Sequence, residues 1–296
     1  MKNTTTRMLA AGSLTAVTAL ALAGCSGGEA ASDDRGEEVT IAVFNGWAES
    51  MVSSELWKAV LEQKGYDVEL VPADPAPVFA GLASGDYDLA TQVSLPTLHA
   101  DYVAQFGDAL EDLGAWYDKS SITVAVNEDA PIDSLDEFLD NADAFGNRIV
   151  GIEAGAGQTQ LMESDVLPGY GLESVDFPTS STPAMLAELD AAISNGENIA
   201  VSLWEPHWAY AVYPLKNLED PKGLLGEPEL LHTFAREGFS DDHAEVAGWL
   251  RDFQMDEERL LDLEELLFVD NDTDEYGPIV DAWIEENQDY VDSLTS

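Results

Sequence analysis

Short apolar runs alternate with segments of helical period along most of the chain. The first series contains strand-like runs at residues 39–44, 67–71 and 88–93 and helical segments at 51–64 and 78–84. The second series contains strand-like runs at 121–126, 148–152, 175–177 and 199–203 and helical segments at 134–141, 158–167 and 183–194. Strands that alternate with helices predict a doubly wound, mainly parallel sheet in each of two similar α/β halves.

The C-terminal part has a different pattern. One strand-like run, residues 231–235, is followed by helical segments at 244–253, 257–267 and 279–291. A single late strand followed by helices is typical of a chain that re-enters its first half. We therefore predict an α/β protein with two lobes, lobe 1 comprising residues 38–121 and 231–296 and lobe 2 comprising 122–230, with a ligand cleft between them.

The N-terminus has the pattern of an export signal. Lys2 and Arg7 precede an uncharged, Ala- and Leu-rich run at residues 8–23, which is too short to span a membrane. It ends in Leu22-Ala23-Gly24-Cys25, which resembles a bacterial lipobox. We predict a lipoprotein signal peptide at 1–24, a lipid anchor on Cys25 and a flexible tether at 25–37. The alternative is an ordinary signal peptide that happens to contain a cysteine.

Composition narrows the class of protein further. Twelve Lys and Arg stand against 58 Asp and Glu, a net charge of −46, which argues against nucleic acid and anionic membrane surfaces as partners. One cysteine excludes an internal disulfide and a multi-cysteine metal site. The acidic run at 270–274 lacks the glycine and glutamate of a calcium loop, so we predict neither a metal nor a cofactor.

Three local motifs indicate a small-molecule site. Trp47 follows the first strand-like run, and Trp204 ends a later one, at the strand ends where open α/β sheets bind ligands. Residues 153–158, Glu-Ala-Gly-Ala-Gly-Gln, connect a strand to a helix and predict either an anion site made by backbone N–H groups or a plain tight turn. His207 and Trp208 follow Trp204 closely, and two indoles and an imidazole so close together in the sequence are rarely needed for packing alone.

Residues 39–268 resemble the glycine betaine (quaternary ammonium) substrate-binding proteins of ABC importers. The likeness is carried by the motifs Trp-Glu-Pro-His-Trp at 204–208, Leu-Lys-Asn-Leu-Glu-Asp-Pro-Lys at 215–222, Gly-Ile-Glu-Ala-Gly-Ala-Gly at 151–157, Leu-Pro-Thr-Leu-His-Ala-Asp-Tyr at 95–102 and Glu-Gly-Phe-Ser at 237–240. The resemblance implies a two-lobed, periplasmic-binding-protein-like fold of type II.

The resemblance also implies a set of ligand-binding residues. In the family, three Trp enclose a trimethylammonium group, while backbone N–H groups and a His bind the carboxylate. Carried over by position, the cage residues are Trp47 and Trp204, the amides are those of Gly157 and Gln158, and the His is His99. Indole faces suit this cation because it has no N–H to donate.

The third cage position departs from the family pattern, because Ser94 stands where a Trp is common. The vacated space would suit a larger or differently shaped zwitterion. Glu205 and His207 flank Trp204 and complete the candidate site, although Glu205 is as readily explained as one more solvent-facing acid.

We therefore expect a lipid-anchored, monomeric solute-binding protein on the extracytoplasmic face of the cell membrane. It would deliver a betaine such as glycine betaine or proline betaine to an ABC permease, in a role in osmoprotection. A bulkier solute such as choline, carnitine or an amino-acid derivative is the alternative. A surface adhesin or an exported hydrolase is less favoured, because no G-x-S-x-G or H-E-x-x-H motif occurs, and no catalytic residues are predicted.

Overall fold

The computed structural model of the protein describes residues 37–271 and 273–296. The predicted signal peptide, Cys25 and all but the last residue of the predicted tether lie outside the described residues.

The described strands form one mixed sheet of seven strands in the order β2-β1-β3-β7-β4-β5, with β6 also paired to β4. They are β1 (Glu38–Phe44), β2 (Asp67–Ala73), β3 (Leu89–Leu95), β4 (Leu110–Asn127), β5 (Ala200–Glu205), β6 (Leu215–Asn217) and β7 (Glu229–Arg236). β1 is parallel to β2 and β3, whereas β7 is antiparallel to β3 and β4, and β4 is antiparallel to β5 and β6.

The prediction of a mainly parallel sheet in each half was wrong. It holds for β1–β3, but β4 is a single strand of 18 residues, of which the sequence pattern indicated only the last part. Its partners β5, β6 and β7 all return antiparallel to it. The predicted strands at 148–152 and 175–177 are reduced to isolated parallel bridges, because runs so short form few ladder hydrogen bonds.

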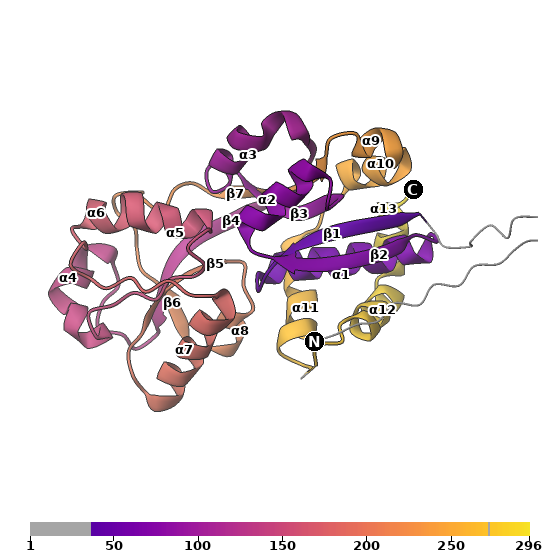
Figure 1. The fold of residues 1–296 in the computed structure, drawn as a ribbon. Coiled ribbons are helices and arrows are strands. Elements are labelled where there is room, and N and C mark those ends of the chain that lie inside the picture. The colour runs from indigo at the N-terminus through magenta and orange to yellow at the C-terminus, as the bar shows by residue number, and fades with distance from the viewer. Residues whose placement is uncertain (1–36, 272) are drawn as a thin grey trace, which may run out of the picture. The chain divides into compact units, whose positions relative to one another are not determined.

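Helices flank this sheet in two groups (Figure 1). The helices are α1 (Ala48–Gln63), α2 (Pro75–Ser84), α3 (Ala100–Phe106), α4 (Phe138–Asn141), α5 (Gly157–Leu161), α6 (Leu167–Tyr170), α7 (Thr182–Asn195), α8 (Ala209–Val212), α9 (Phe239–Asp242), α10 (Ala244–Asp252), α11 (Glu257–Phe268), α12 (Gly277–Glu286) and α13 (Gln288–Leu294). Three 3₁₀ turns (Gly107–Ala109, Leu135–Glu137, Ala142–Phe145) and a π-helical turn (Met162–Val166) complete the set.

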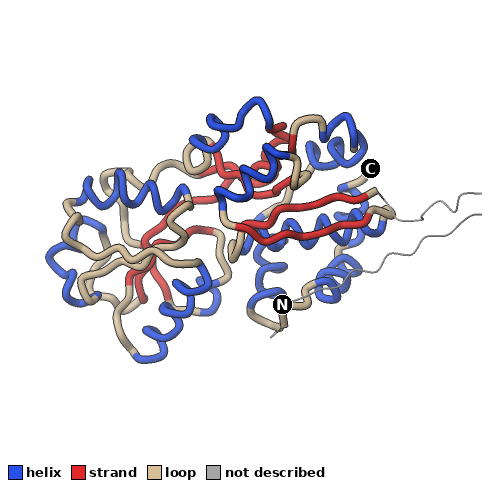
Figure 2. The backbone as a smooth tube through the Cα atoms, in the orientation of Figure 1, coloured by secondary structure: helices blue, strands red, loops and turns tan. Residues whose placement is uncertain are grey.

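We call the part with β1–β3, all but the first two residues of β7, α1–α3 and α9–α13 lobe 1, and the part with β5, β6 and α4–α8 lobe 2. The last helices, coloured orange to yellow in Figure 1, lie beside the first strands, coloured indigo. Apart from α7, the helices of lobe 2 are only four or five residues long, and loops connect them (Figure 2).

Helix ends follow local sequence signals. α2 begins with Pro75 in its first turn and ends at Gly85, whose left-handed φ of 78° suits glycine. At α7, the Ser181 hydroxyl accepts the N–H of Ala184, and the helix ends at Gly196 with φ 68°. The predicted helix at 279–291 is divided at Asn287, which ends α12 and precedes α13.

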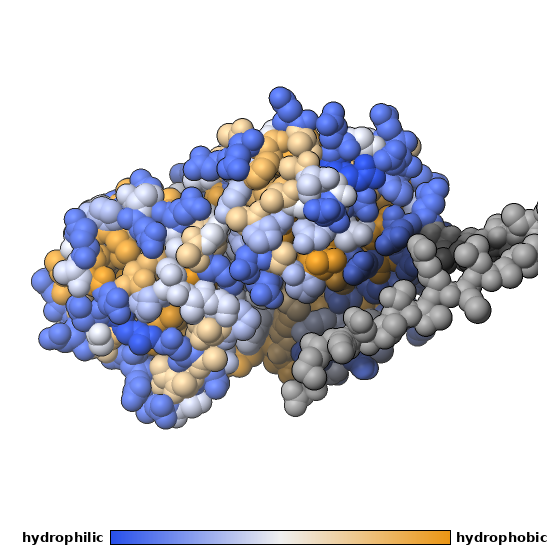
Figure 3. Space-filling view, viewed as in Figure 1, coloured by the Kyte–Doolittle hydropathy of each residue, from blue (hydrophilic) through white to orange (hydrophobic). Residues whose placement is uncertain are grey.

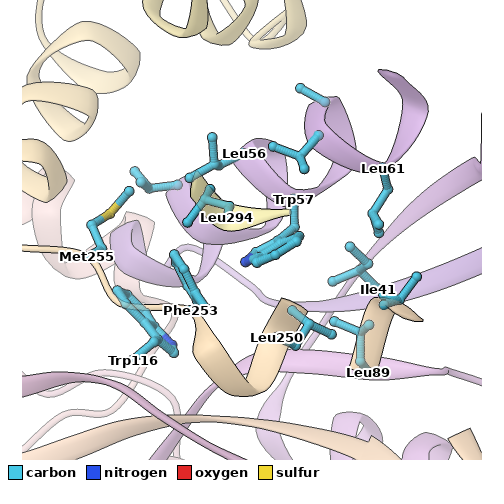
Figure 4. Close-up of a cluster of buried hydrophobic side chains, with 14 of the residues drawn as sticks. Ile41, Leu56, Trp57, Leu61, Leu89, Trp116, Leu250, Phe253, Met255 and Leu294 are labelled. Carbon is cyan, nitrogen blue, oxygen red and sulfur yellow. The ribbon is translucent and has the colours of Figure 1, made fainter. Parts of the chain in front are cut away.

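Two hydrophobic cores lie within single lobes. The lobe 1 core includes Trp57, which meets Phe253 edge to face at 5.3 Å, and Trp116, which stacks on the same ring at 5.2 Å (Figure 4). The lobe 2 core is built only from residues between Val124 and Leu218. A third cluster contains residues of both lobes, Trp47 and Trp204 among them, and it surrounds the candidate site.

Hydrophilic residues cover most of the face seen in Figure 3, with smaller apolar areas between them. Within residues 37–271 and 273–296, no helix is long and apolar enough to cross a membrane.

Candidate functional site

Loops and strand ends from both lobes meet at one pocket. Six of the eight predicted site residues line it: Trp47, Ser94, His99, Gly157, Gln158 and Trp204. The other lining residues are Gln92, Leu98, Ser120, Ile122 and Ile152. The space left between these side chains is about 20 Å³, enough for about one water molecule. The structure therefore represents the site in a closed arrangement.

Two indoles form the apolar walls of the pocket. Trp47 precedes α1 directly after β1, and Trp204 lies near the end of β5; their ring centroids are 6.4 Å apart and their planes are inclined by 58°. Both side chains are buried. Trp47 is fixed from behind by Phe44, which stacks on it at 4.8 Å, and from its edge by Glu153, which accepts its indole N–H at 3.3 Å. Rings fixed in this way offer preorganised faces to a ligand.

His99 supplies a hydrogen-bond donor beside these walls. The backbone N–H of Ser94 donates to Nδ1 at 2.9 Å, so a neutral imidazole carries its proton on Nε2. Burial lowers the pKa of His99 to about 3, which keeps the ring neutral near pH 7. Nε2 is buried and has no hydrogen-bond partner among the described residues. A buried N–H of this kind is suited to a ligand oxygen.

Polar side chains of β3 and β4 form a further wall of the pocket, at the position where the family pattern suggested a third ring. Ser94 lies on β3 with Gln92, and Ser120 lies on β4, which is separated from β3 in the sheet by β7. The Gln92 Oε1 atom is buried and has no hydrogen-bond partner among the described residues. This wall therefore offers oxygen atoms where an aromatic face was expected.

The glycine turn is held by its own side chains. Glu153 accepts the N–H and the hydroxyl of Thr182, at 2.7 and 3.1 Å, in addition to the indole of Trp47. The Gln158 side chain donates to the Ser202 hydroxyl at 2.7 Å and to the Leu203 carbonyl at 3.2 Å. The first N–H groups of a helix have no acceptor within the helix, so those of Gly157 and Gln158 at the start of α5 are free to bind a ligand oxygen.

The two lobes touch at the glycine turn. A Cβ on Gly157 would lie 1.9 Å from the Leu98 carbonyl oxygen, so only glycine fits at this approach. The Tyr102 hydroxyl donates to the Gly155 carbonyl at 3.0 Å, and the Tyr102 ring stacks on Phe79 at 4.6 Å. These contacts hold lobe 1 against lobe 2 around the pocket.

The remaining two predicted residues do not line the pocket. His207 is buried behind Trp204, which it meets edge to face at 4.7 Å, and its Nδ1 accepts the N–H of Ala209 at 3.0 Å. Glu205 is the last residue of β5 and is exposed, whereas the five residues before it in the strand are all buried. Trp208 stacks on Phe268 of α11 at 6.2 Å. His207 thus supports a wall of the pocket, and Glu205 faces solvent.

Sequence reasoning missed Gln92, Ser120 and Ile122 as lining residues. They lie inside strands, and their residue types are ordinary there, so no local motif marks them. Glu153 was seen as part of the glycine turn, but its bond to Trp47 depends on lobe contact. Among the described residues, no cluster of His, Cys, Asp and Glu could hold a metal ion.

The fold and this cleft are those of a two-lobed solute-binding protein. The structure is similar to that of the glycine betaine, L-proline-binding protein ProX from Borrelia burgdorferi, with TM-score 0.81 and 30% identity over 88% of this chain and 97% of that one. It is also similar to lactococcal OpuAC in its closed form with glycine betaine, with TM-score 0.80 and 26% identity over 88% and 100%. The predicted two-lobed, periplasmic-binding-protein-like fold is confirmed.

Residues 37–286 match the family described as the substrate binding domain of ABC-type glycine betaine transport systems, and the chain belongs to that family. The predicted resemblance is thereby confirmed. The glycine betaine/carnitine transport binding protein GbuC of Listeria monocytogenes is 32% identical over 162 residues, which is 54% of this chain and 53% of GbuC. The chain thus spans about half the length of this curated relative.

Proposed function

We propose that this protein binds a small betaine-type quaternary ammonium zwitterion between Trp47 and Trp204 and delivers it to the permease of an ABC importer. The observation that carries the proposal is the pairing of two buried indoles with the unpartnered Nε2–H of a neutral His99. Family membership supports it, as do the ligands named for GbuC and for lactococcal OpuAC.

The cationic end of the ligand would lie between the indoles. A trimethylammonium group has methyls and no N–H, so it gains from cation–π attraction and apolar contact, about 0.5–2 kcal/mol per ring. Trp47 and Trp204 offer two such faces, and Ile122 and Ile152 add apolar surface. The lobes would have to open before the ligand enters, because the closed pocket holds about 20 Å³, and they would close again around it.

The carboxylate of the ligand would meet three N–H donors. They are the Nε2–H of His99 and the backbone N–H groups of Gly157 and Gln158 at the start of α5. Hydrogen bonds to an ionised acceptor are the stronger kind, so this end would fix the orientation of the ligand.

We infer that lobe 1 comprises residues 38–121 and 231–296 and that lobe 2 comprises 122–230, with closure about their junction. Two separate cores support these boundaries, as does the change of partner along β4, which pairs with β7 up to Ser120 and with β5 from Ser121. We expect a monomer without a catalytic role, in keeping with a family of transport proteins.

Attachment to the membrane would be through a lipid on Cys25, on the extracytoplasmic face. The lipobox-like sequence 22–25 supports this part of the proposal. Metabolic labelling with a fatty acid, followed by mass spectrometry of the N-terminal peptide, tests it. Incorporation that persists in Cys25→Ala would contradict the anchor.

Calorimetric titration and thermal unfolding test the ligand. The panel contains glycine betaine, proline betaine, carnitine and choline, with glycine as a control that lacks the methyl groups. We expect binding and a raised Tm with at least one methylated betaine and none with glycine, since a ligand stabilises the folded state in proportion to its affinity. No response to any quaternary ammonium compound would refute the proposal.

A further inference from the structure

Two glutamates next to the candidate site are completely buried. Glu49 lies in the first turn of α1, two residues after Trp47, and Glu264 lies on α11; each is 0% exposed. None of their four carboxylate oxygens has a hydrogen-bond partner among the described residues. Neither takes part in an ion pair with a Lys, Arg or His of residues 37–271 and 273–296. Unpaired buried charges are costly, so this arrangement favours bound protons.

Residues of lobe 2 cover both carboxyl groups. Glu49 lies beside the indole N–H of Trp204 and the amide of Gln92, although neither contact reaches hydrogen-bond geometry. Glu264 lies beside the backbone N–H of Trp208, and the Trp208 ring packs on α11 through Phe268. Both glutamates belong to lobe 1, because they lie on α1 and α11. Their neighbours Trp204 and Trp208 belong to lobe 2. Residues of lobe 2 thus help to shield the carboxyl groups from solvent.

The other titratable groups around the pair carry no compensating charge. Tyr117 of β4 lies near both carboxylates, and burial raises the pKa of its phenol, so it stays neutral. His207, which packs on Trp204, is neutral because burial lowers its pKa to about 3. Burial raises the pKa of Glu49 to about 7, and burial together with the charge of Glu49 raises the pKa of Glu264 well above its usual value.

We propose that Glu49 and Glu264 form a proton-binding site linked to closure, so that closing the lobes over a ligand takes up a proton from solvent. This inference rests on the proposed function, because it takes ligand-driven closure as given. When lobe 2 moves away, Trp204 and Trp208 uncover the carboxyl groups and water solvates them. The open form then ionises both more easily than the closed form does.

The direction of the pH dependence follows from this difference. In the open form both groups approach their ordinary pKa of 4.5, whereas in the closed form both are raised. Between these values the open protein has lost protons that the closed protein holds, so closure takes up protons and affinity falls as the pH rises. For each proton taken up, Kd rises by up to about tenfold per pH unit.

Calorimetry on the wild-type protein tests the inference without any substitution. Glycine betaine is titrated at pH 6.5 in buffers of different ionisation enthalpy, and the slope of observed enthalpy against that quantity gives the number of protons exchanged. Because closure raises the pKa of both carboxyl groups, we expect uptake of between one and two protons at this pH, and a Kd that rises between pH 5.5 and 8. We expect smaller uptake with choline, because a cation without a carboxylate favours the ionised pair. No net proton exchange at any pH in this range would overturn the inference.

Variants locate the site of the proton. Glu49→Gln/Glu264→Gln should abolish proton uptake and flatten the dependence of Kd on pH. Glu265→Gln, which alters an exposed glutamate on the same helix, should retain both. Uptake that persists in the double variant would show that another group binds the proton and would refute the assignment. If wild-type protein binds no quaternary ammonium ligand, the proposed function fails; if it binds one without proton exchange, only this inference fails.

Discussion

Gly157→Ala adds one methyl group at the closest approach between the lobes. Gly157 is the first residue of α5, and its backbone has a conformation that alanine adopts readily. The substitution is unfavourable because of a steric clash with the opposite lobe. The new Cβ would lie 1.9 Å from the Leu98 carbonyl oxygen, whereas ordinary contact begins at 3.4 Å. One of the two backbones must therefore retreat by about 1.5 Å, the difference between these distances.

Leu98 is poorly able to retreat, because its loop is held. The N–H groups of Thr97 and Leu98 donate to the buried Glu229 carboxylate at 3.1–3.2 Å. Overpacking of a close contact costs about 1–3 kcal/mol, which is about 5- to 150-fold in Kd. The open form lacks the contact, so the cost falls on closure and thus on ligand affinity.

The assay is calorimetric titration with glycine betaine, together with thermal unfolding of the ligand-free protein. We expect a weaker Kd in the range above with a ligand-free Tm close to wild type. Gly155→Ala is the matched control, because its Cβ would meet only the Tyr102 hydroxyl, at an ordinary 3.6 Å. A Kd for Gly157→Ala within twofold of wild type would refute the argument that this contact forms in the ligand-bound state.

Four further substitutions test the site and separate binding from stability. Trp204→Ala should abolish calorimetric binding, whereas Trp57→Ala, in the lobe 1 core, should lower stability by about 3–5 kcal/mol with less effect on affinity; equal losses of affinity would contradict the assignment. Ser94→Trp should shift the ranking of ligands toward glycine betaine and away from carnitine in competition titrations. An unchanged ranking would contradict the hypothesis that Ser94 replaces a third cage Trp and leaves room for a larger ligand. His99→Phe keeps a ring against Trp47 but removes the Nε2–H, so affinity for glycine betaine should fall by about 1.5–3 kcal/mol; because burial lowers the pKa of His99 to about 3, the pH dependence between 5.5 and 8 should be the same in this variant as in wild type.

The pattern of apolar positions predicted most helices within a few residues, because their apolar faces and end signals are local. It failed for β4, since residues 122–127 form a continuous buried run, whereas irregularities in the pairing with β7 break the alternation of buried and exposed residues in the first part of the strand. It also failed at the bridges around Arg148 and Asp176, where the pairing depends on neighbours distant in sequence.

The site could be predicted to the extent that chemistry marks its residues. Trp47, Trp204 and the glycine turn were visible because indoles at strand ends and paired glycines are unusual. The roles of Glu153 and Glu49 could not be predicted from the sequence. The chain contains 58 Asp and Glu residues, and nothing in the sequence distinguishes a buried carboxylate from the other 57. Whether a carboxyl group is buried depends on which residues of the two lobes pack around it, and this packing is set by the fold.

The change of partner along β4 has a consequence for how such proteins can be recombined. β4 pairs with β7 up to Ser120, which lies opposite Glu229, and with β5 from Ser121. The two points at which the chain passes between the lobes are therefore adjacent on paired strands. With the proposed boundaries, lobe 2 is a single continuous insert whose ends lie side by side. Exchanging residues 122–230 between family members would thus transplant Trp204 and the glycine turn in one piece, creating chimaeras in which the two halves of the ligand site come from different parents.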